Sequence, residues 1–279
     1  MRKLKTFAPS SIIILLINIL IISSCVSETR KAAEQKMNQA SGLILSGEFE
    51  RGMALLDSIP VWFPEEYGIV GKALNLKKEA ASAYHHEFIE QAQTMLDEFT
   101  PQITELSKNF IFTEGPPGRP GTYEHKRQTV RRSWNRIFLK TNVTENGQFW
   151  LSTHYFGSDW IDHYCIKVYD KELYLFSDTI PLSHLDNRKI EDGTDRWEKI
   201  DFRDGADNGI VGLIAQYQDR RLKVRFTGKK HYYIVMESFD KKAVKEGYEL
   251  AQVLKEVYEL KQKIGQHKKE LRLLGVSDE

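Results

Sequence analysis

The stretch Gly115-Pro116-Pro117-Gly118-Arg119-Pro120-Gly121 divides the chain into two parts with different hydrophobic periods. Three prolines and three glycines within seven residues can neither continue a helix nor lie in the interior of a sheet. We therefore expect a linker at residues 115–121, with a helical region at residues 25–114 before it and a second domain after it.

Downstream of this linker, residues 122–239 alternate between apolar and polar side chains, which is the period of a β-strand. In Leu222-Lys223-Val224-Arg225-Phe226 the apolar and basic side chains fall on opposite faces. Strands with one buried and one wet face are typical of antiparallel sheets, and about seven such segments predict a β-sandwich-like domain. The exception is residues 210–217, whose helical spacing predicts a short helix capped by Asp207 or Asn208.

On both sides of the predicted β domain, apolar residues recur in steps of three and four, which indicates amphipathic helices. The upstream seam consists of Ala92, Leu96, Phe99, Ile103, Leu106 and Phe110, and the downstream seam, on a helix at residues 240–274, of Gly247, Leu250, Leu254, Val257 and Ile264. Thr100-Pro101 predicts that the first helix kinks or restarts there. The expected fold is therefore α+β, with the amino-terminal and carboxy-terminal helices packed as a stalk for a central β domain. The same apolar stripes also permit a homodimer.

The composition of the 279 residues is that of a globular protein, with 41% apolar and 28% charged residues. A net charge of +1 argues against a nucleic-acid binder, and two cysteines cannot form a disulfide scaffold. The sequence contains no nucleophile elbow, phosphate loop, dinucleotide fingerprint or zinc motif. We therefore expect no cofactor and no metal.

The amino end carries three cations, Arg2, Lys3 and Lys5, followed by an apolar run of 11 residues from Ile12 to Ile22. This run suits a signal peptide and is shorter than the ~18 residues of a membrane span. Ile22-Ser23-Ser24-Cys25 resembles the lipobox of bacterial lipoproteins. The resemblance implies a cleaved signal peptide at residues 1–24, a lipid on Cys25 and a membrane as partner. With Val26 in place of an aspartate, it also implies the outer membrane or cell surface.

Residues near 30–64 resemble a tetratricopeptide-type helical hairpin. Gly47 stands at the turn, Phe49 and Leu55-Leu56 at packing positions, and Pro64 at the end. Gly52 replaces the usual alanine and no second copy follows, so the resemblance implies a single hairpin and no repeat array.

The sharpest polar group consists of His154, Asp159, Asp162 and His163. If residues 149–156 and 160–168 form a hairpin, His154 lies across from Asp162, and the carboxylate can orient the imidazole. The alternatives are a cross-strand ion pair and a metal or catalytic site. Cys165, the thiol that remains once Cys25 is lipidated, is expected to be a small buried hydrophobe.

Basic and aromatic residues supply a second candidate site for ligands. Arg131 and Arg132 shortly precede Trp134, and Trp160 follows a predicted turn, so these residues suit an anionic or sugar ligand. The sequence therefore predicts a lipid-anchored envelope protein that acts as a binding or scaffold module, with an envelope protein or a glycan as partner. The alternative is an envelope hydrolase with a site near His154 and Asp162.

Overall fold

The computed structural model describes residues 10–276, with side chains from Glu28 onward. The chain divides into two compact units, one up to Ala92 together with the chain from Ile264 onward, and one from Gln93 to Lys263. The lipidation site at Cys25 and the whole of the expected signal peptide lie outside the residues whose side chains are described. Among the described residues, no helix is both long and apolar enough to cross a bilayer.

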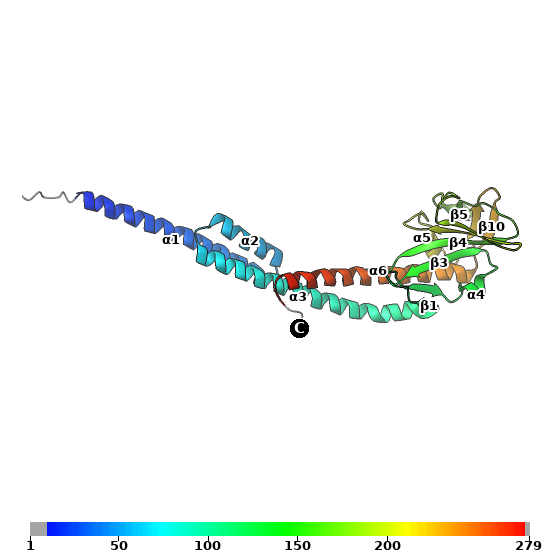
Figure 1. The fold of residues 1–279 in the computed structure, drawn as a ribbon, viewed down its shortest axis with the longest axis horizontal. Coiled ribbons are helices and arrows are strands. Elements are labelled where there is room, and N and C mark those ends of the chain that lie inside the picture. The colour runs from blue at the N-terminus through cyan, green and yellow to red at the C-terminus, as the bar shows by residue number, and fades with distance from the viewer. Residues whose placement is uncertain (1–9, 277–279) are drawn as a thin grey trace, which may run out of the picture. The chain divides into compact units, whose positions relative to one another are not determined.

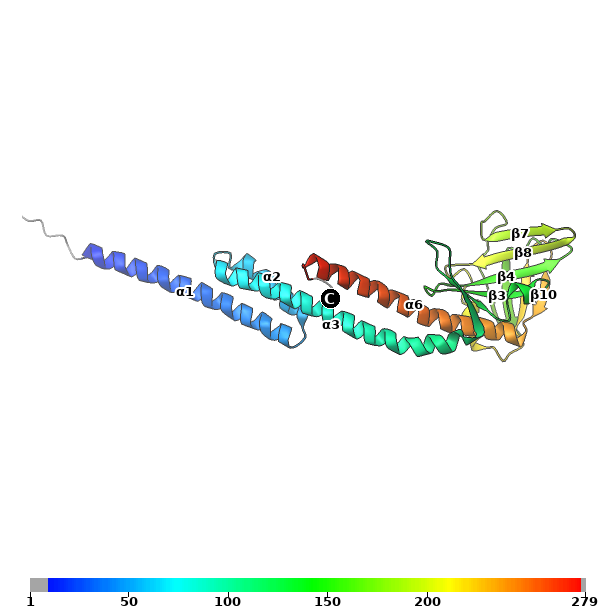
Figure 2. The ribbon, with the colours of Figure 1, turned by 60° about the horizontal axis from the view of Figure 1, so that its bottom comes forward.

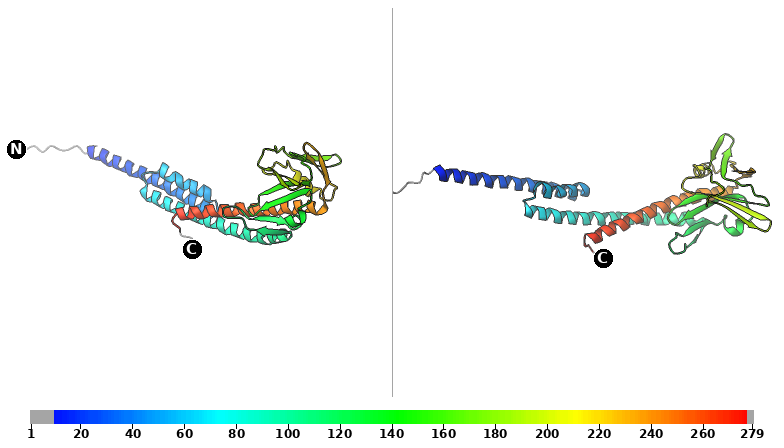
Figure 3. Two further views of the ribbon diagram at one scale, coloured as in Figure 1. Left: turned by 45° about the vertical axis from the view of Figure 1, so that its right-hand side comes forward. Right: turned by 45° about the horizontal axis from the view of Figure 1, so that its top comes forward.

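The first unit is built from three helices that bury small and aliphatic side chains between them. They are α1 (Ser10–Leu45), α2 (Phe49–Trp62) and the first part of α3 (Tyr67–Leu106). Figure 3 shows α1 and α2 side by side. Gly47 turns the chain between them with φ +83, and a Cβ on Gly52 would lie 2.6 Å from Cγ1 of Ile44. A larger residue than glycine at position 52 would therefore push these helices apart, while the resemblance to a known repeat stays a prediction.

The end of α6 (Ser238–Leu273) contacts α3 through a pair of histidines within this unit. His267 stacks on Phe88 with ring centroids 3.8 Å apart, and its Nδ1 lies 3.0 Å from Nδ1 of His85. Burial, and then the neighbouring His85, lower the pKa of His267, although Glu270 opposes this. One proton can bridge the two nitrogens, but a proton on each would place two N–H groups face to face.

We expect acid to loosen this histidine contact. Because the folded state lowers the pKa of His267, the contact is complete above the ordinary histidine pKa of about 6.5 and weakens as the pH falls below it. Amide hydrogen exchange of residues 264–273, compared at about pH 7.5 and about pH 5, measures this opening. His267→Phe keeps a ring for stacking and should remove the pH dependence beyond the intrinsic exchange rate, whereas exposed His184→Gln should not. An equal pH response in His267→Phe would contradict the prediction.

The second unit contains two antiparallel sheets. The larger consists of β1 (Phe110–Thr113), β2 (Thr122–His125), β3 (Phe138–Thr144), β4 (Phe149–Gly157), β8 (Asp195–Phe202) and β7 (Asn187–Asp192), in that order. The smaller consists of β10 (Tyr232–Val235), β9 (Lys223–Thr227), β5 (Cys165–Asp170) and β6 (Leu173–Phe176), in that order. Figure 1 shows β4 and β5 in separate sheets, and Figure 2 shows β3, β4, β8 and β7 as neighbours. The predicted α+β class with an antiparallel β domain is confirmed.

One core joins the two sheets. Leu139 and Leu151 from the larger sheet pack in the same cluster as Val168 and Phe226 from the smaller one. The short helix α5 (Ile210–Gln216) adds apolar side chains to this core. Its N-cap is Gly209 and not the predicted Asp207 or Asn208, although the Asp207 carboxylate accepts a hydrogen bond from Val211 N. Cys165 is buried, as expected, and burial raises the pKa of its thiol.

The first part of α6 packs on the larger sheet along the predicted seam. Leu250 and Leu254 are buried against Phe110, Val143 and the end of α3. At Gly247 a Cβ would lie 2.3 Å from Cγ2 of Thr141, so the missing side chain lets the helix approach β3. Leu250 and Leu254 of the downstream seam are thus covered by the chain itself within this unit.

Three further expectations about local structure are wrong. Phe110–Thr113 is a strand, and it pairs with β2 across residues 115–121, so the proline- and glycine-rich segment connects two paired strands. The helix α3 runs without interruption from Tyr67 to Leu106 and so does not restart at Pro101, whereas a kink there stays a prediction. Segments 149–156 and 160–168 do not form a hairpin, since β4 and β5 belong to different sheets.

Candidate functional site

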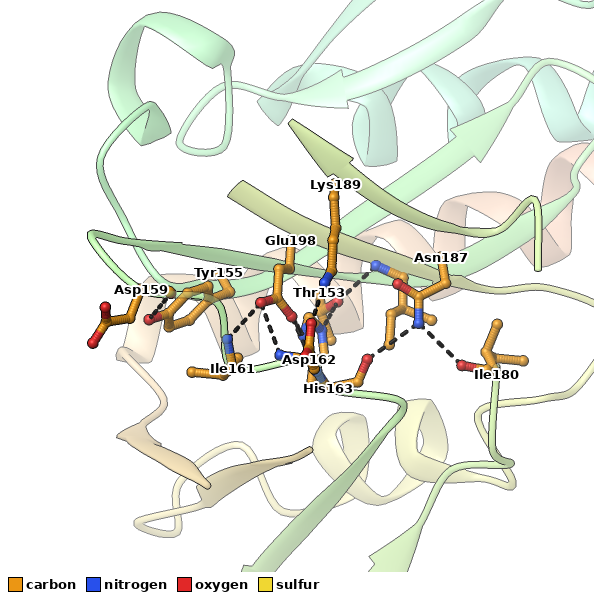
Figure 4. A network of polar contacts seen from close by, with 11 residues as sticks. Thr153, Tyr155, Asp159, Ile161, Asp162, His163, Ile180, Asn187, Lys189 and Glu198 are labelled. Atoms are coloured by element: carbon orange, nitrogen blue, oxygen red, sulfur yellow. Dashed lines mark hydrogen bonds and ion pairs between the residues drawn. The ribbon is translucent and has the colours of Figure 1, made fainter. Parts of the chain in front are cut away.

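A buried carboxylate, Glu198 on β8, organises the segment that crosses between the two sheets. Its Oε1 accepts hydrogen bonds from the backbone N–H groups of Ile161 (2.6 Å) and Asp162 (2.9 Å). Its Oε2 accepts from N (3.0 Å) and Nδ1 (2.7 Å) of His163. Burial alone would raise the pKa of Glu198, but these hydrogen bonds outweigh burial and lower it. The carboxylate is therefore ionised, and each of its two oxygens accepts two hydrogen bonds (Figure 4).

His163 extends this contact to a hydroxyl on β4. Because Nδ1 donates to Glu198, a neutral imidazole accepts at Nε2, which lies 2.8 Å from Oγ1 of Thr153. The same hydroxyl accepts from Ile200 N at 2.8 Å. We call Glu198, His163 and Thr153 the Glu198 cluster. Carboxylate, imidazole and hydroxyl stand in the order of a nucleophilic triad.

The Glu198 cluster cannot receive a substrate in this conformation. All three side chains are 0% exposed, and their polar contacts are made to one another and to the backbone. A nucleophile has to reach the atom that it attacks, at about 3 Å. The cluster therefore acts here as a structural link between β4, β8 and the segment around His163.

The Asp162 side chain lies apart from this cluster and is held by two lysines. Asp162 has φ 52, and its carboxylate pairs with Lys189 and, at 2.7 Å, with Lys229. The hydrogen bonds to Lys189 and Lys229 lower the pKa of Asp162. The ring of Trp160 lies nearby, beneath Lys189 with 4.8 Å from Nζ to the ring centroid. The carboxylate that was expected to orient His154 is thus engaged elsewhere.

His154 points to the opposite face of the larger sheet, because neighbouring residues of β4 alternate between its two faces. There it lines a pocket of about 160 Å³, which we call the outer-face pocket. The pocket is lined by Val130, Ser133, Trp134, Lys140, Asn142, Ser152, Thr153, His154, Arg188, Lys199 and Asp201. The structure therefore brings His154 together with Trp134, and no described interaction joins His154 to Asp162.

The imidazole of His154 is neutral at physiological pH. Burial, and to a smaller extent Lys199 and Lys140, lower its pKa to about 4, although a hydrogen bond with the Arg136 carbonyl opposes this. Nδ1 donates to that carbonyl at 2.8 Å, which leaves Nε2 as the acceptor. No described residue bonds to Nε2, so a ligand hydroxyl can donate to it.

Three cations gather around His154, and one of them lacks a counter-ion. Lys140 pairs with Glu124 at 2.7 Å, and Arg188 pairs with Asp201 at 2.8 Å. Half-buried Lys199 makes no hydrogen bond or ion pair within the described residues. Burial, and then Lys140 and Arg188, lower the pKa of Lys199, although Asp201 opposes this. The pocket therefore favours a bound anion.

Trp134 forms one wall of the outer-face pocket. The residue is 50% exposed, its ring centroid lies 4.8 Å from that of the buried Trp197, and its carbonyl accepts a hydrogen bond from Trp197 Nε1. The neighbouring Arg131 and Arg132 are exposed on α4 (Val130–Ser133) and do not line the pocket. Of the residues predicted to bind ligand, Trp134 thus lies at the pocket, whereas Arg131, Arg132 and Trp160 do not.

The cations of this pocket were not singled out in the sequence. Lys140 and Lys199 occupy alternate positions of predicted strands, which places them on a wet face but gives no pairing partner. Arg188 lies on β7, a strand that the sequence pattern did not indicate. Among the described residues, no group of three or more histidine, cysteine, aspartate or glutamate side chains is arranged to hold a metal ion.

Comparisons of this chain with protein-family models, with curated proteins and with solved structures found no match.

Proposed function

We propose that this chain is a lipid-anchored bacterial envelope protein whose β domain binds a small anionic ligand in the outer-face pocket. The amino-terminal cations, the short apolar run and Cys25 support the anchor, which would be placed at the outer membrane or cell surface. The helices would serve as a spacer and docking surface, and an envelope protein or glycan would be the source of the ligand.

The main support for a binding role is the half-buried ammonium group of Lys199, which has no partner among the described residues. A buried charge without a partner is costly, and a bound anion would remove this cost. Lys199 lies beside Lys140 and Arg188, which add to the positive potential. The pocket is smaller than the roughly 300–1,000 Å³ of sites for drug-sized ligands, so the ligand would be a small molecule or one unit of a polymer.

The other residues that line the pocket indicate which chemical groups this ligand would carry. Nε2 of the neutral His154 would accept a hydroxyl proton, and the exposed ring of Trp134 would pack against an apolar face. A carboxylate for Lys199, a hydroxyl for His154 and a ring face for Trp134 occur together in a uronic acid. We therefore choose glucuronate as the probe, with glucose as the uncharged match.

Glucuronate is expected to bind to the full chain more tightly than glucose, and Lys199→Met should weaken its binding by about tenfold or more, because a hydrogen bond to a charged group is lost. Isothermal titration calorimetry measures both affinities. Lys171→Met, at an exposed turn lysine outside the pocket, should change neither. Equal affinities for the two sugars, or glucuronate binding that is unchanged in Lys199→Met, would refute the binding role.

The anchor has its own test. Labelled palmitate is expected to attach to the chain in a bacterial host, and Cys25→Ser should release the protein from the membrane fraction, because two or more acyl chains are needed for stable attachment. A Cys25→Ser chain that still takes up palmitate and sediments with membranes would refute the anchor without affecting the ligand site.

A further inference from the structure

The outward face of the smaller sheet carries cations and aromatic rings in alternation. In the register of the sheet, Arg225 lies between Tyr233 and Lys167, and Lys167 lies opposite Phe176. In the next row, Lys223 lies opposite Tyr169, and Tyr169 lies opposite Tyr174. We call this surface the cationic-aromatic face; its residues are Lys167, Tyr169, Tyr174, Phe176, Lys223, Arg225 and Tyr233.

The opposite face of these strands packs against the core. Ile166 and Val168 of β5 and Val224 and Phe226 of β9 are buried there, and β6 and β10 contribute the partly buried Leu173, Leu175 and Ile234. Because residues of a strand alternate between faces, the cationic-aromatic face points away from the core. Tyr174, Phe176 and Tyr233 are 54%, 40% and 55% exposed. Aromatic residues on an outer sheet face are seldom explained by packing when half of their surface remains in water.

The cations of this face have no acidic partner. Among the described residues, Lys167 and Lys223 make no ion pair, and Arg225 only donates to the Thr227 hydroxyl, at 3.2 Å. Nζ of Lys167 lies 4.3 Å from the ring centroid of Tyr174 and 5.2 Å from that of Phe176. The ammonium group of Lys167 and the aromatic rings therefore lie close enough together to contact the same sugar unit.

We propose that the cationic-aromatic face binds a linear acidic polysaccharide. A uronic acid unit carries a carboxylate and an apolar C–H face on one ring, and the face offers a cation and an aromatic ring at the same short spacing. Paired residues on neighbouring strands lie about 5 Å apart, so successive units can meet successive cations. This inference concerns a second surface and does not depend on the outer-face pocket or on the lipid anchor.

The same features fit two other polyanions less well. In single-stranded nucleic acid the phosphate and the stacking base are separated by a sugar, and strong binders usually have a marked excess of basic residues, whereas this chain has a net charge of +1. A bilayer surface favours residues that insert below the headgroups, whereas here Lys167 and Arg225 lie among the rings. Both polyanions are used as competing probes.

The test uses the full chain with Cys25→Ser, so that no lipid anchor contributes to binding. Hexagalacturonate is expected to bind, with affinity that falls as salt is added, and maltohexaose is expected to bind far less. Lys223→Met and Tyr174→Ser, both at exposed positions, should each weaken hexagalacturonate binding by about tenfold. Lys223→Arg should retain it, because the charge is kept.

Two further measurements make the outcome decisive. Lys199→Met in the outer-face pocket should leave the affinity for hexagalacturonate unchanged, which separates this surface from the pocket. Thermal unfolding of each variant confirms that it is folded. The proposal is overturned if Lys223→Met and Tyr174→Ser bind hexagalacturonate like the parent, or if the chain prefers polydeoxythymidine or phosphatidylglycerol vesicles to hexagalacturonate.

Discussion

Replacing Glu198 with alanine is expected to lower the free energy of unfolding of the β domain by about 3–5 kcal/mol. The Glu198 carboxylate accepts from three backbone N–H groups and from the imidazole of His163, and all of these donors are buried. Removing the carboxylate leaves each donor without an acceptor and without access to water. The loss should therefore exceed that of an ordinary buried hydrogen bond several-fold.

Denaturant unfolding followed by tryptophan fluorescence measures this loss. A Trp62→Phe background restricts the signal to the second unit, since Trp62 is the tryptophan outside it. Glu191→Ala is a suitable control, because Glu191 is a half-exposed carboxylate on β7 with a single ion pair to Arg196. A Glu198→Ala chain that unfolds at the same denaturant concentration as Glu191→Ala would show that the cluster does not hold the sheets together.

Linkage adds a pH signature to the Glu198 prediction. Because the folded state lowers the pKa of Glu198, its contribution is fully present above the ordinary glutamate pKa of about 4.3 and is lost as the pH falls through the lower folded value. Acid should therefore destabilise the parent chain more than Glu198→Ala. The two unfolding free energies should converge as the pH is lowered.

Replacing Gly147 with alanine is expected to destabilise the same domain by about 2–5 kcal/mol. Gly147 lies in the turn between β3 and β4 with φ +78, where a side chain is strained. A Cβ there would also lie 2.2 Å from the backbone N of Lys255 in α6. Neither the turn nor the helix backbone can yield cheaply, so the turn would have to leave the helix.

Gly193→Ala separates the two causes. Gly193 lies in the turn between β7 and β8 with φ +59, and a Cβ there has no neighbour within 4 Å. The free energy of unfolding of this variant should therefore fall only by the conformational cost of the positive φ, about 1–2 kcal/mol. The difference between the two variants, measured by the same fluorescence assay, reports the contact of the turn with α6. Equal losses would mean that the turn and the helix do not depend on each other.

Local patterns in the sequence were sufficient to predict the types of element. The alternation in residues 222–226 predicted which side chains of β9 face the core, and the seam through Leu250 and Leu254 predicted the buried stripe of α6. These predictions succeed because the side-chain period follows from backbone geometry alone. β1, β2 and β7 were missed, since each of them buries a single residue and the apolar alternation is weak.

Tertiary structure alone decided which strands are neighbours, and through them the sites. A hairpin of residues 149–156 and 160–168 would have placed His154 opposite Asp162. Instead, β4 pairs with β8, so His154 lies beside Lys199, and His163 forms a hydrogen bond with Glu198. The sequence by itself determined the elements, their faces and the amino-terminal pattern around Cys25. Strand order depends on packing between residues far apart in the chain, and no local period records it.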